Sequence, residues 1–261
     1  MFRIIKRYGQ HYLTDKSIAF QTANSLPINS CKNVLEVGPG FGALTKHLYE
    51  QPINLTVVEI DKKSLEALKI HVPSYTLNII HEDFLKLNLY EIFNQKEFSV
   101  IGNFPYNISS QILFRVLEHH RLIPNLVGMF QKEVAQRITS GPGSKEYGIL
   151  SVMTQLYYHP ELLFDVPSNV FYPQPKVESS VIRLTRLDDD QYPCRMDLLY
   201  KIIKSSFNHR RKQLRSSLKK FMFPEFMLDD EVFSKRPEQL TALEFVEITK
   251  QLEYENFSSY R

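Results

Sequence analysis

The stretch Val34-Leu35-Glu36-Val37-Gly38-Pro39-Gly40-Phe41-Gly42-Ala43-Leu44-Thr45 decides the fold. Its first four residues are mostly apolar and strand-like, and they run into a glycine-rich loop after which a helix is expected to begin. Gly38 and Gly40 let the backbone turn tightly and approach a ligand closely. The free N–H groups at the start of the following helix are suited to contact that ligand. The stretch therefore predicts the first strand, loop and helix of a ligand-binding α/β sheet.

Strand-like and helical patterns alternate along the first two thirds of the chain. The expected strands are short apolar or β-branched runs and fall at residues 34–37, 55–60, 77–81, 98–101 and 179–184. Helical patterns occur at residues 64–71 and 110–119. This alternation predicts a doubly wound, mainly parallel sheet. Ligands bind at the carboxyl ends of the strands in such a sheet, and these strands are followed by glycine and polar residues.

Two acidic residues extend the expected cofactor site. Glu59 ends the second strand, roughly 20 residues after the loop, where an acid can hydrogen-bond ribose hydroxyls. Asp83 follows the third strand, where a carboxylate can accept a hydrogen bond from the exocyclic amine of an adenine. The glycine loop also satisfies the relaxed dinucleotide pattern, so NAD and S-adenosylmethionine are both open as cofactors at this point. Glu36, directly ahead of the glycines, and Asp83 favour S-adenosylmethionine.

Composition narrows the class of protein. The chain has 261 residues, of which 43% are hydrophobic and 23% charged, and this suits one large domain with a small appendage. No apolar run approaches the roughly 18 residues of a membrane span. Residues 1–7 are interpreted as a basic arm rather than a signal peptide. Cys31 and Cys194 lie far apart without ligand-like neighbours, so neither a disulfide framework nor a metal site is expected, and the expected compartment is the cytoplasm.

An acidic break at residues 188–193 predicts a domain boundary, with domains at residues 1–187 and 188–261. Everything beyond the break is expected to be helical. One apolar helix face is predicted from residues that recur at helical spacing, namely Ile203, Phe207, Leu214, Leu218 and Phe221.

The second domain carries a one-signed cluster, although the net charge of the chain is only +3. Residues 201–224 include no acid, and their cations include Lys204, Arg210, Arg211, Lys212, Arg215, Lys219 and Lys220. Such a cluster is typical of a phosphate-binding surface, and the alternative is a solvated helix face.

The sharpest chemical signal is the run Gly102-Asn103-Phe104-Pro105-Tyr106-Asn107-Ile108-Ser109, which follows the fourth expected strand. The side-chain oxygen of Asn103 and the backbone carbonyl of Phe104 could accept the N–H bonds of an adenine N6 amine and so localise its lone pair. Pro105 rigidifies the turn. Tyr106 offers a face for the base, and such stacking contributes about 1–3 kcal/mol. The alternative is a structural turn with a packed tyrosine.

This run resembles the Asn-aromatic/aliphatic-Pro-Tyr motif of amino-methyltransferases, and nearly the whole chain resembles the KsgA family of small-subunit rRNA adenine dimethyltransferases. The matching segments lie at residues 8–15, 131–135, 147–152, 171–179 and 207–218. The resemblance implies an α/β fold: a Rossmann-like class I methyltransferase sheet with a small all-helical C-terminal domain. It implies S-adenosyl-L-methionine as cofactor and N6,N6-dimethylation of two adjacent adenosines in a hairpin loop of small-subunit (16S) rRNA.

The resemblance also implies roles for individual residues. The catalytic residues would be Asn103, Phe104, Pro105, Tyr106 and Phe171, with Phe171 stacked on the far face of the target base. The cofactor would contact His11, Leu13, Gly38, Gly40, Glu59, Asp83 and Asn103. A basic helix carrying Arg210, Arg211, Lys212 and Arg215 would bind RNA.

Three positions depart from the family pattern or bear on its RNA contacts. Phe104 stands where the family usually has leucine, and Tyr12 stands where phenylalanine is common. Both departures are expected to have little effect. The tyrosine at Tyr8 and the short arm before it leave RNA contacts at the N-terminus open.

Four alternatives compete with this interpretation. Large-subunit rRNA adenine methyltransferases of the macrolide-resistance type share its chemistry. A non-catalytic ribosome-assembly factor is disfavoured by the complete motif, and a DNA adenine methyltransferase by the lack of an evident DNA-recognition domain. An NAD-dependent oxidoreductase lacks a candidate hydride-transfer site. The expected partner is the small ribosomal subunit or its precursor, with no membrane, no metal and a monomeric chain.

Overall fold

The computed structural model describes residues 10–72, 77–188, 192 and 194–258. The basic arm at residues 1–7, Tyr8 and residues 189–191 and 193 of the acidic break lie outside the described residues. By their contacts, the described residues divide into two compact units. The first comprises Met1–Ala135 with His159–Arg186, and the second Gln136–Tyr158 with Leu187–Arg261.

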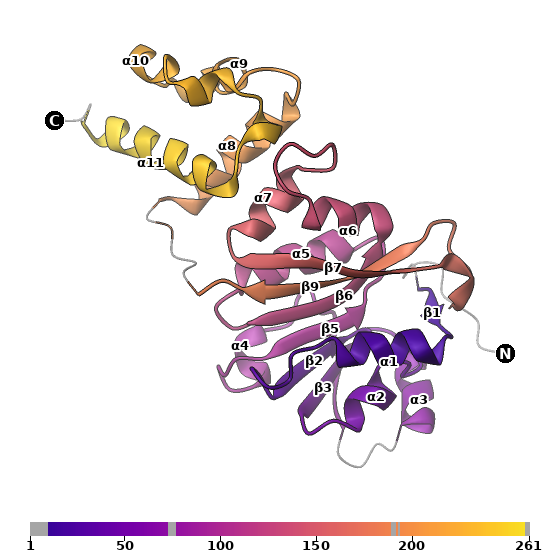
Figure 1. Ribbon diagram of the computed structural model, residues 1–261. Helices are drawn as coiled ribbons and strands as arrows, with labels where there is room; N and C mark the ends of the chain where they lie inside the picture. The colour runs from indigo at the N-terminus through magenta and orange to yellow at the C-terminus, as the bar shows by residue number, and fades with distance from the viewer. Residues whose placement is uncertain (1–9, 73–76, 189–191, 193, 259–261) are drawn as a thin grey trace. The chain divides into compact units, whose positions relative to one another are not determined.

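The described residues of the chain form one seven-stranded sheet with the order β4-β3-β2-β5-β6-β9-β7 (Figure 1). Its strands are β2 (Asn33–Val37), β3 (Asn54–Glu59), β4 (Asn78–His81), β5 (Ser99–Asn103), β6 (Asn125–Gln131), β7 (Tyr158–Val166) and β9 (Ser179–Arg186). Neighbours from β4 to β6 pair in parallel, and β6 pairs with β9 antiparallel. The prediction of a mainly parallel α/β sheet is confirmed. β6 and β7 were not predicted. Pro160 of β7 is compatible with an edge strand because an edge leaves backbone groups unpaired.

Helices lie on both faces of this sheet, with α1, α2 and α3 in front and α5 behind in the view of Figure 1. The helices up to β7 are α1 (Lys16–Asn24), α2 (Thr45–Tyr49), α3 (Lys62–His71), α4 (Leu89–Ile92), α5 (Ser109–Glu118), α6 (Lys132–Thr139) and α7 (Ile149–Gln155). Among the described residues, no helix is both long and apolar enough to cross a bilayer.

The order of winding reverses at β2. From β2 the chain adds β3 and then β4 on one side, and it returns to add β5 and then β6 on the other. Connections leaving β2 and β5 therefore diverge, and a crevice opens at the carboxyl ends of these two strands. The glycine loop follows β2, and the Asn103 motif begins at the end of β5.

A separate two-stranded sheet joins the N-terminal segment to a distant part of the chain. Strand β1 (Tyr12–Leu13) pairs antiparallel with β8 (Phe171–Tyr172), so that Tyr12 lies opposite Tyr172 and Leu13 opposite Phe171. The N–H of Thr14 extends the pairing to the carbonyl of Val170 at 2.9 Å. A one-turn helix, η2 (Ser168–Val170), precedes β8.

The second unit is helical. Besides α7, its elements are α8 (Met196–Asn208), α9 (Leu214–Ser217), η3 (Lys219–Phe221), α10 (Glu225–Leu228), η4 (Glu231–Ser234), η5 (Pro237–Gln239) and α11 (Ala242–Ser258). Residues 136–158, which we predicted in the first domain, group with this unit. The ring of Tyr147 packs edge-on against Phe207, and the N–H of Gly143 donates to the carbonyl of Glu238 at 2.7 Å.

The prediction of one continuous basic helix is wrong. Helix α8 ends at Asn208, and the N–H of Lys212 donates to the carbonyl of His209 at 2.7 Å in a tight turn before α9 begins. Asparagine and histidine are weak helix formers, and the apolar spacing continues across the turn because both helices bury side chains in the same unit. Ile203, Leu214 and Leu218 are buried, whereas Phe207 and Phe221 are half-buried.

The unusual phenylalanine of the Asn103 motif is accommodated by glycine. Phe104 is buried and packs edge-on against Phe130 with ring centroids 5.2 Å apart. A Cβ added to Gly128, on the neighbouring strand β6, would lie 2.3 Å from a ring carbon of Phe104. The larger ring therefore fills space that the bare backbone of Gly128 leaves open.

Replacing Gly128 with alanine should destabilise the protein by roughly 1–3 kcal/mol, because the new methyl group overlaps a buried ring. The cost should fall in part when Phe104→Leu is introduced as well, since the smaller side chain gives way while the contact at 2.8 Å from a ring carbon of Phe130 remains. Gly141→Ala is the control, because a Cβ there meets no atom within 4 Å. The measurement is the free energy of unfolding in denaturant, and equal costs with Phe104 or leucine present would contradict the packing explanation.

Candidate active site

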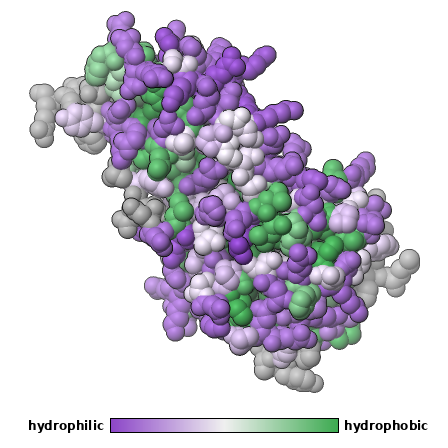
Figure 2. All heavy atoms as spheres, viewed as in Figure 1, coloured by the Kyte–Doolittle hydropathy of each residue, from purple (hydrophilic) through white to green (hydrophobic). Residues whose placement is uncertain are grey.

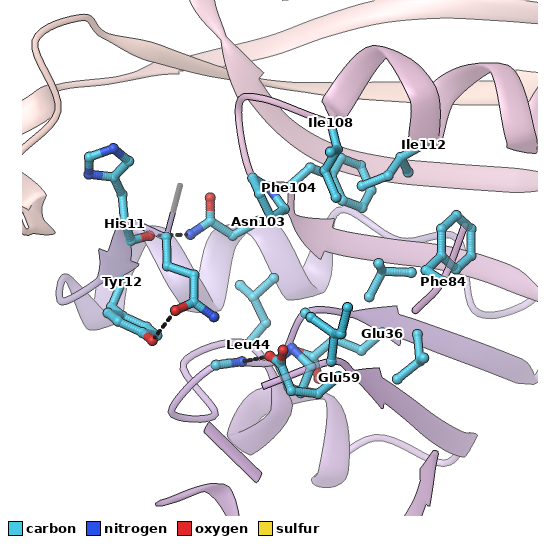
Figure 3. A pocket seen from close by; sticks show the side chains of 18 of the residues that line it. His11, Tyr12, Glu36, Leu44, Glu59, Phe84, Asn103, Phe104, Ile108 and Ile112 are labelled. Carbon is cyan, nitrogen blue, oxygen red and sulfur yellow. Dashed lines mark hydrogen bonds between the residues drawn. The ribbon is translucent and has the colours of Figure 1, made fainter. Parts of the chain in front are cut away.

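A pocket of about 310 Å³ lies at the carboxyl ends of β2, β3 and β5. Its volume falls in the range of small-molecule sites. The glycine loop, the Asn103 motif and the segment after β4 contribute to its walls, as does the N-terminal strap, which we define as Gln10, His11, Tyr12 and Leu13 (Figure 3). The crevice predicted from the strand order is therefore a formed pocket.

The glycine loop has the backbone conformation that the sequence predicted. Gly38 and Gly40 have φ angles of +70° and +54°, which residues other than glycine rarely adopt. The N–H of Gly38 donates to the carbonyl of Val58 at 2.9 Å, which joins the loop to β3. Both glycines line the pocket and present bare backbone to it.

Glu59 lies at the end of β3 and lines the pocket. Its Oε1 accepts from the N–H of Asp61 at 2.9 Å, and its Oε2 accepts from the N–H of Gly40 at 3.4 Å. Burial raises the pKa of this carboxyl, and the backbone donors oppose that shift. Backbone groups thus orient the carboxylate while it faces the pocket. A carboxylate that accepts hydrogen bonds from ribose hydroxyls needs such an orientation.

Glu36, on β2, is a buried acid without a complete set of partners. It is 1% exposed and lines the pocket. Burial raises its pKa to about 8, and its Oε2 has no hydrogen-bond partner among the described residues. A buried carboxyl of this kind is suited to receive a hydrogen-bond donor or a cation from a ligand.

The strap contacts the Asn103 motif directly. The side-chain Nδ2 of Asn103 donates to the backbone carbonyl of His11 at 2.9 Å, across 92 positions of sequence (Figure 3). A carbonyl only accepts, so this bond determines which end of the amide faces the strap. The side-chain oxygen of Asn103 is therefore the end available to a ligand in the pocket.

Tyr106 lies on the pocket wall with its ring orientation set by two contacts. Its hydroxyl is 2.7 Å from Oγ of Ser179, a buried residue at the start of β9. Burial raises the pKa of Tyr106. Its ring also stacks on His11, with centroids 5.2 Å apart and planes inclined by 30°. The Nδ1 of His11 is in turn 2.6 Å from the carbonyl of Pro173.

Most of the predicted site residues are brought together at this pocket. Leu13, Asp83, Phe104 and Pro105 line it, in addition to the residues described above. Phe171 is different: it is 4% exposed, belongs to the buried core and is not among the residues that line the pocket. Its position follows from the alternation of β8, because Phe171 lies opposite the buried Leu13 while Tyr172 is exposed.

The four predicted RNA-binding residues of the second unit differ in environment. Arg210 is engaged within the protein: its guanidinium donates to the carbonyl of Ser144 at 3.0 Å and lies 3.7 Å from a carboxylate oxygen of Glu238. Arg211, Lys212 and Arg215 are exposed. Arg211 and Lys212 lie in the turn after α8, and Arg215 lies on α9.

Sequence reasoning missed some residues that line or support the pocket. Gln10, Phe84 and Ile112 line it, and Ser179 contacts Tyr106. Gln10 and Ser179 lie inside the segments that carried the family resemblance, and that resemblance is the signal by which they could have been found.

Replacing Glu36 with glutamine should change the dependence of stability on pH. In the folded protein the pKa of Glu36 is about 8, whereas the unfolded chain ionises near its ordinary value of about 4.3. Between these values the folded state keeps a proton that the unfolded state releases, so the stability of the wild type decreases as pH rises, by up to about 1.4 kcal/mol per pH unit. Denaturant unfolding of both proteins without cofactor should show the Glu36→Gln variant gaining relative stability from about pH 5 to about pH 8. A difference independent of pH would contradict the buried protonated acid.

The comparisons with known proteins agree with this geometry. The family model "Ribosomal RNA adenine dimethylase" matches residues 1–251. A "Ribosomal RNA small subunit methyltransferase A" from Flavobacterium johnsoniae is 48% identical over 254 residues, which covers 97% of each chain. A protein of the same name from Parabacteroides distasonis is 49% identical over 247 residues, covering 94% of this chain and 92% of the relative.

Two solved structures have a similar fold. A dimethyladenosine transferase from Plasmodium falciparum has a TM-score of 0.81 at 23% identity and covers 94% of this chain and 98% of its own. The 23S rRNA methyltransferase ErmE has a TM-score of 0.71 at 26% identity and covers 92% of this chain and 100% of its own. The predicted Rossmann-like class I methyltransferase fold is thereby confirmed, and the chain belongs to the ribosomal RNA adenine dimethylase family.

Proposed function

We propose that the chain transfers methyl groups from S-adenosyl-L-methionine to N6 of two adjacent adenosines in a hairpin loop of small-subunit rRNA, giving N6,N6-dimethyladenosine during small-subunit biogenesis. The observation that carries the proposal is the orientation of Asn103. Its Nδ2 is committed to the carbonyl of His11, so its oxygen is the acceptor left for an adenine amine.

The pocket fits the cofactor. Gly38 and Gly40 would pass close to its methionine portion, and Glu59 would accept from its ribose hydroxyls. Asp83 would accept from its adenine amine; its Oδ1 already accepts from the N–H of Leu85 at 3.0 Å. The unpartnered Oε2 of Glu36 suits a ligand that carries an ammonium group and a sulfonium. When bound, S-adenosylmethionine supplies an activated methyl group.

The Asn103 motif would position the target base. Tyr106 stacks on one face of the adenine, while the Asn103 oxygen and the Phe104 carbonyl accept from its N6 amine. Pro105 keeps the turn rigid between them. Taking the adenosine out of its loop costs a few kcal/mol, and less if it is unpaired. These residues act by positioning and electrostatics, and the amine can lose its proton to solvent after transfer.

Phe171 stays a prediction as the second stacking residue. Its ring is 4% exposed, so β8 would have to move before the ring could reach a base in the pocket. His11 already stacks on Tyr106, and it is the strap residue that would contact both cofactor and base.

Two alternative functions, a large-subunit rRNA methyltransferase and a non-catalytic assembly factor, are less well supported than the proposed one. The relatives at 46–49% identity are named ribosomal RNA small subunit methyltransferase A, whereas the 23S rRNA methyltransferase ErmE is 26% identical. The small-subunit assignment is therefore favoured over the macrolide-resistance type. A non-catalytic assembly factor would not need the oriented Asn103 amide. As partner we propose the small subunit or its 16S rRNA precursor, bound by a single chain in the cytoplasm.

The deciding experiment offers labelled S-adenosylmethionine with under-methylated small subunits, with large subunits and duplex DNA in parallel, followed by nucleoside analysis. Label is expected as N6,N6-dimethyladenosine in small-subunit RNA. The Asn103→Ala variant should lose transfer by two orders of magnitude or more, because it removes the acceptor for the amine. Cofactor affinity should fall far less, by about 10-fold at most, because the only bond lost on that side is the one from Nδ2 to the strap. Turnover retained by that variant, or label in large-subunit RNA or DNA, would overturn the proposal.

We further propose that the second unit binds RNA phosphates through Arg211, Lys212 and Arg215. These cations are exposed and lie on or beside α9, in a stretch without acids. Arg210 would instead act within the unit, where it joins the turn after α8 to the loop at Ser144 and to Glu238.

Replacing Arg211, Lys212 and Arg215 with alanine together should weaken RNA binding and reduce the slope of log affinity against log salt by about 2, at about 0.7 per lost phosphate contact. The matched variant is Arg210→Ala, which should lower the melting temperature but leave the slope nearly unchanged. Binding titrations between low and moderate salt check both. A slope that does not change in the triple variant would exclude this surface from RNA contact.

A further inference from the structure

Tyr12 contacts the cofactor loop through its ring. The ring stacks on Phe41 with centroids 4.0 Å apart and planes inclined by 8°. A Cβ added to Gly40 would lie 3.0 Å from Cδ1 of Tyr12, so the ring lies directly against bare backbone of the loop. Phenylalanine, the residue that is common in the family at this position, could make both contacts.

The hydroxyl of Tyr12 adds contacts that phenylalanine lacks. Its single proton points to Oε1 of Gln10 at 2.8 Å (Figure 3). Oγ of Ser64, which is buried near the start of α3, lies 3.3 Å from the same hydroxyl. Because the Ser64 hydroxyl donates to Asp61, the Tyr12 proton is shared between Gln10 and Ser64. Burial raises the pKa of Tyr12, so the hydroxyl keeps its proton and remains a donor at neutral pH. Our expectation that this departure has little effect did not take these contacts into account.

Ser64 continues the connection toward the cofactor site. Its hydroxyl donates to Oδ2 of Asp61 at 3.0 Å, and the N–H of Asp61 donates to Oε1 of Glu59 at 2.9 Å. A line of polar contacts therefore runs from the strap to the carboxylate proposed to bind the ribose. Displacing the strap would break the first contact in this line.

We propose that Tyr12 is a positioning residue whose hydroxyl holds the strap closed over the cofactor and thereby slows cofactor exchange. The inference rests on the proposed function, because it takes the pocket as the S-adenosylmethionine site. Adding two methyl groups to one amine consumes two cofactor molecules, so spent cofactor must leave between the two transfers. The strap residues line the pocket, and their opening must separate Tyr12 from Phe41 and from Ser64.

The test measures cofactor dissociation directly, without RNA. The full chain is loaded with labelled S-adenosylhomocysteine and chased with an excess of unlabelled compound. Tyr12→Phe keeps the ring contacts and loses the hydroxyl, so dissociation should be about 2- to 10-fold faster, the effect of one hydrogen bond. The association rate should stay nearly the same, whereas a general distortion of the pocket would lower it.

Two further variants sharpen the result. Tyr172→Phe is the matched control, because Tyr172 lies opposite Tyr12 in the two-stranded sheet and is 59% exposed. The loss of this exposed hydroxyl should leave the dissociation rate unchanged. Ser64→Ala removes the contact with Tyr12 and also the bond to Asp61. It should therefore speed dissociation in the wild type, and it should have a clearly smaller effect in the Tyr12→Phe background, where the shared contact is already lost.

The outcomes separate the two proposals. An unchanged dissociation rate in Tyr12→Phe, or effects of the two substitutions that simply multiply, would overturn the role of the hydroxyl and leave methyl transfer untouched. A wild-type chain that binds no labelled compound would overturn the proposed function together with this inference.

Discussion

The structure depends on the parallel pairing of β2 with a strand on each side, β3 and β5. Because the winding reverses at this strand, the loops that leave β2 and β5 diverge and leave a crevice between them. The glycine loop and the Asn103 motif lie on either side of that gap, and the acid that ends β3 faces it. The site is thus a consequence of strand order first and of side-chain chemistry second.

The parts of the site that follow a strand could be predicted from the sequence. Gly38, Glu59 and Asn103 each lie at or just after the end of a β-branched or apolar run, and parallel strands bring such ends to one edge. The strap could not be predicted in this way. It reaches the pocket through pairing of β1 with β8, more than 150 residues away in the chain, which no local pattern encodes. Only the family resemblance pointed to His11 and Leu13.

Where the structure differs from what the sequence suggested, the causes are physical and of the same kind. Apolar residues recur at helical spacing from Ile203 to Leu218, across the turn between α8 and α9, because both helices bury one face in the same core. This spacing alone therefore does not reveal that α8 ends at Asn208. Charge counting treats Arg210 like its neighbours, yet a backbone carbonyl and a carboxylate within the unit occupy its guanidinium. Phe171 is aromatic and lies in a family motif, but strand alternation directs it into the core.

The packing of Phe104 against Gly128 has a consequence for how such enzymes can be recombined. Gly128 lies on β6, and Phe104 directly follows the neighbouring parallel strand β5. The identity of one residue therefore sets the space available to the other. A chimera that took the Asn103 motif from a leucine-containing relative would leave a void over β6, and a Phe-containing motif needs a glycine at the position of Gly128 in the strand that receives it. The Asn103 motif and strand β6 must therefore be exchanged together, although only the motif lines the active site.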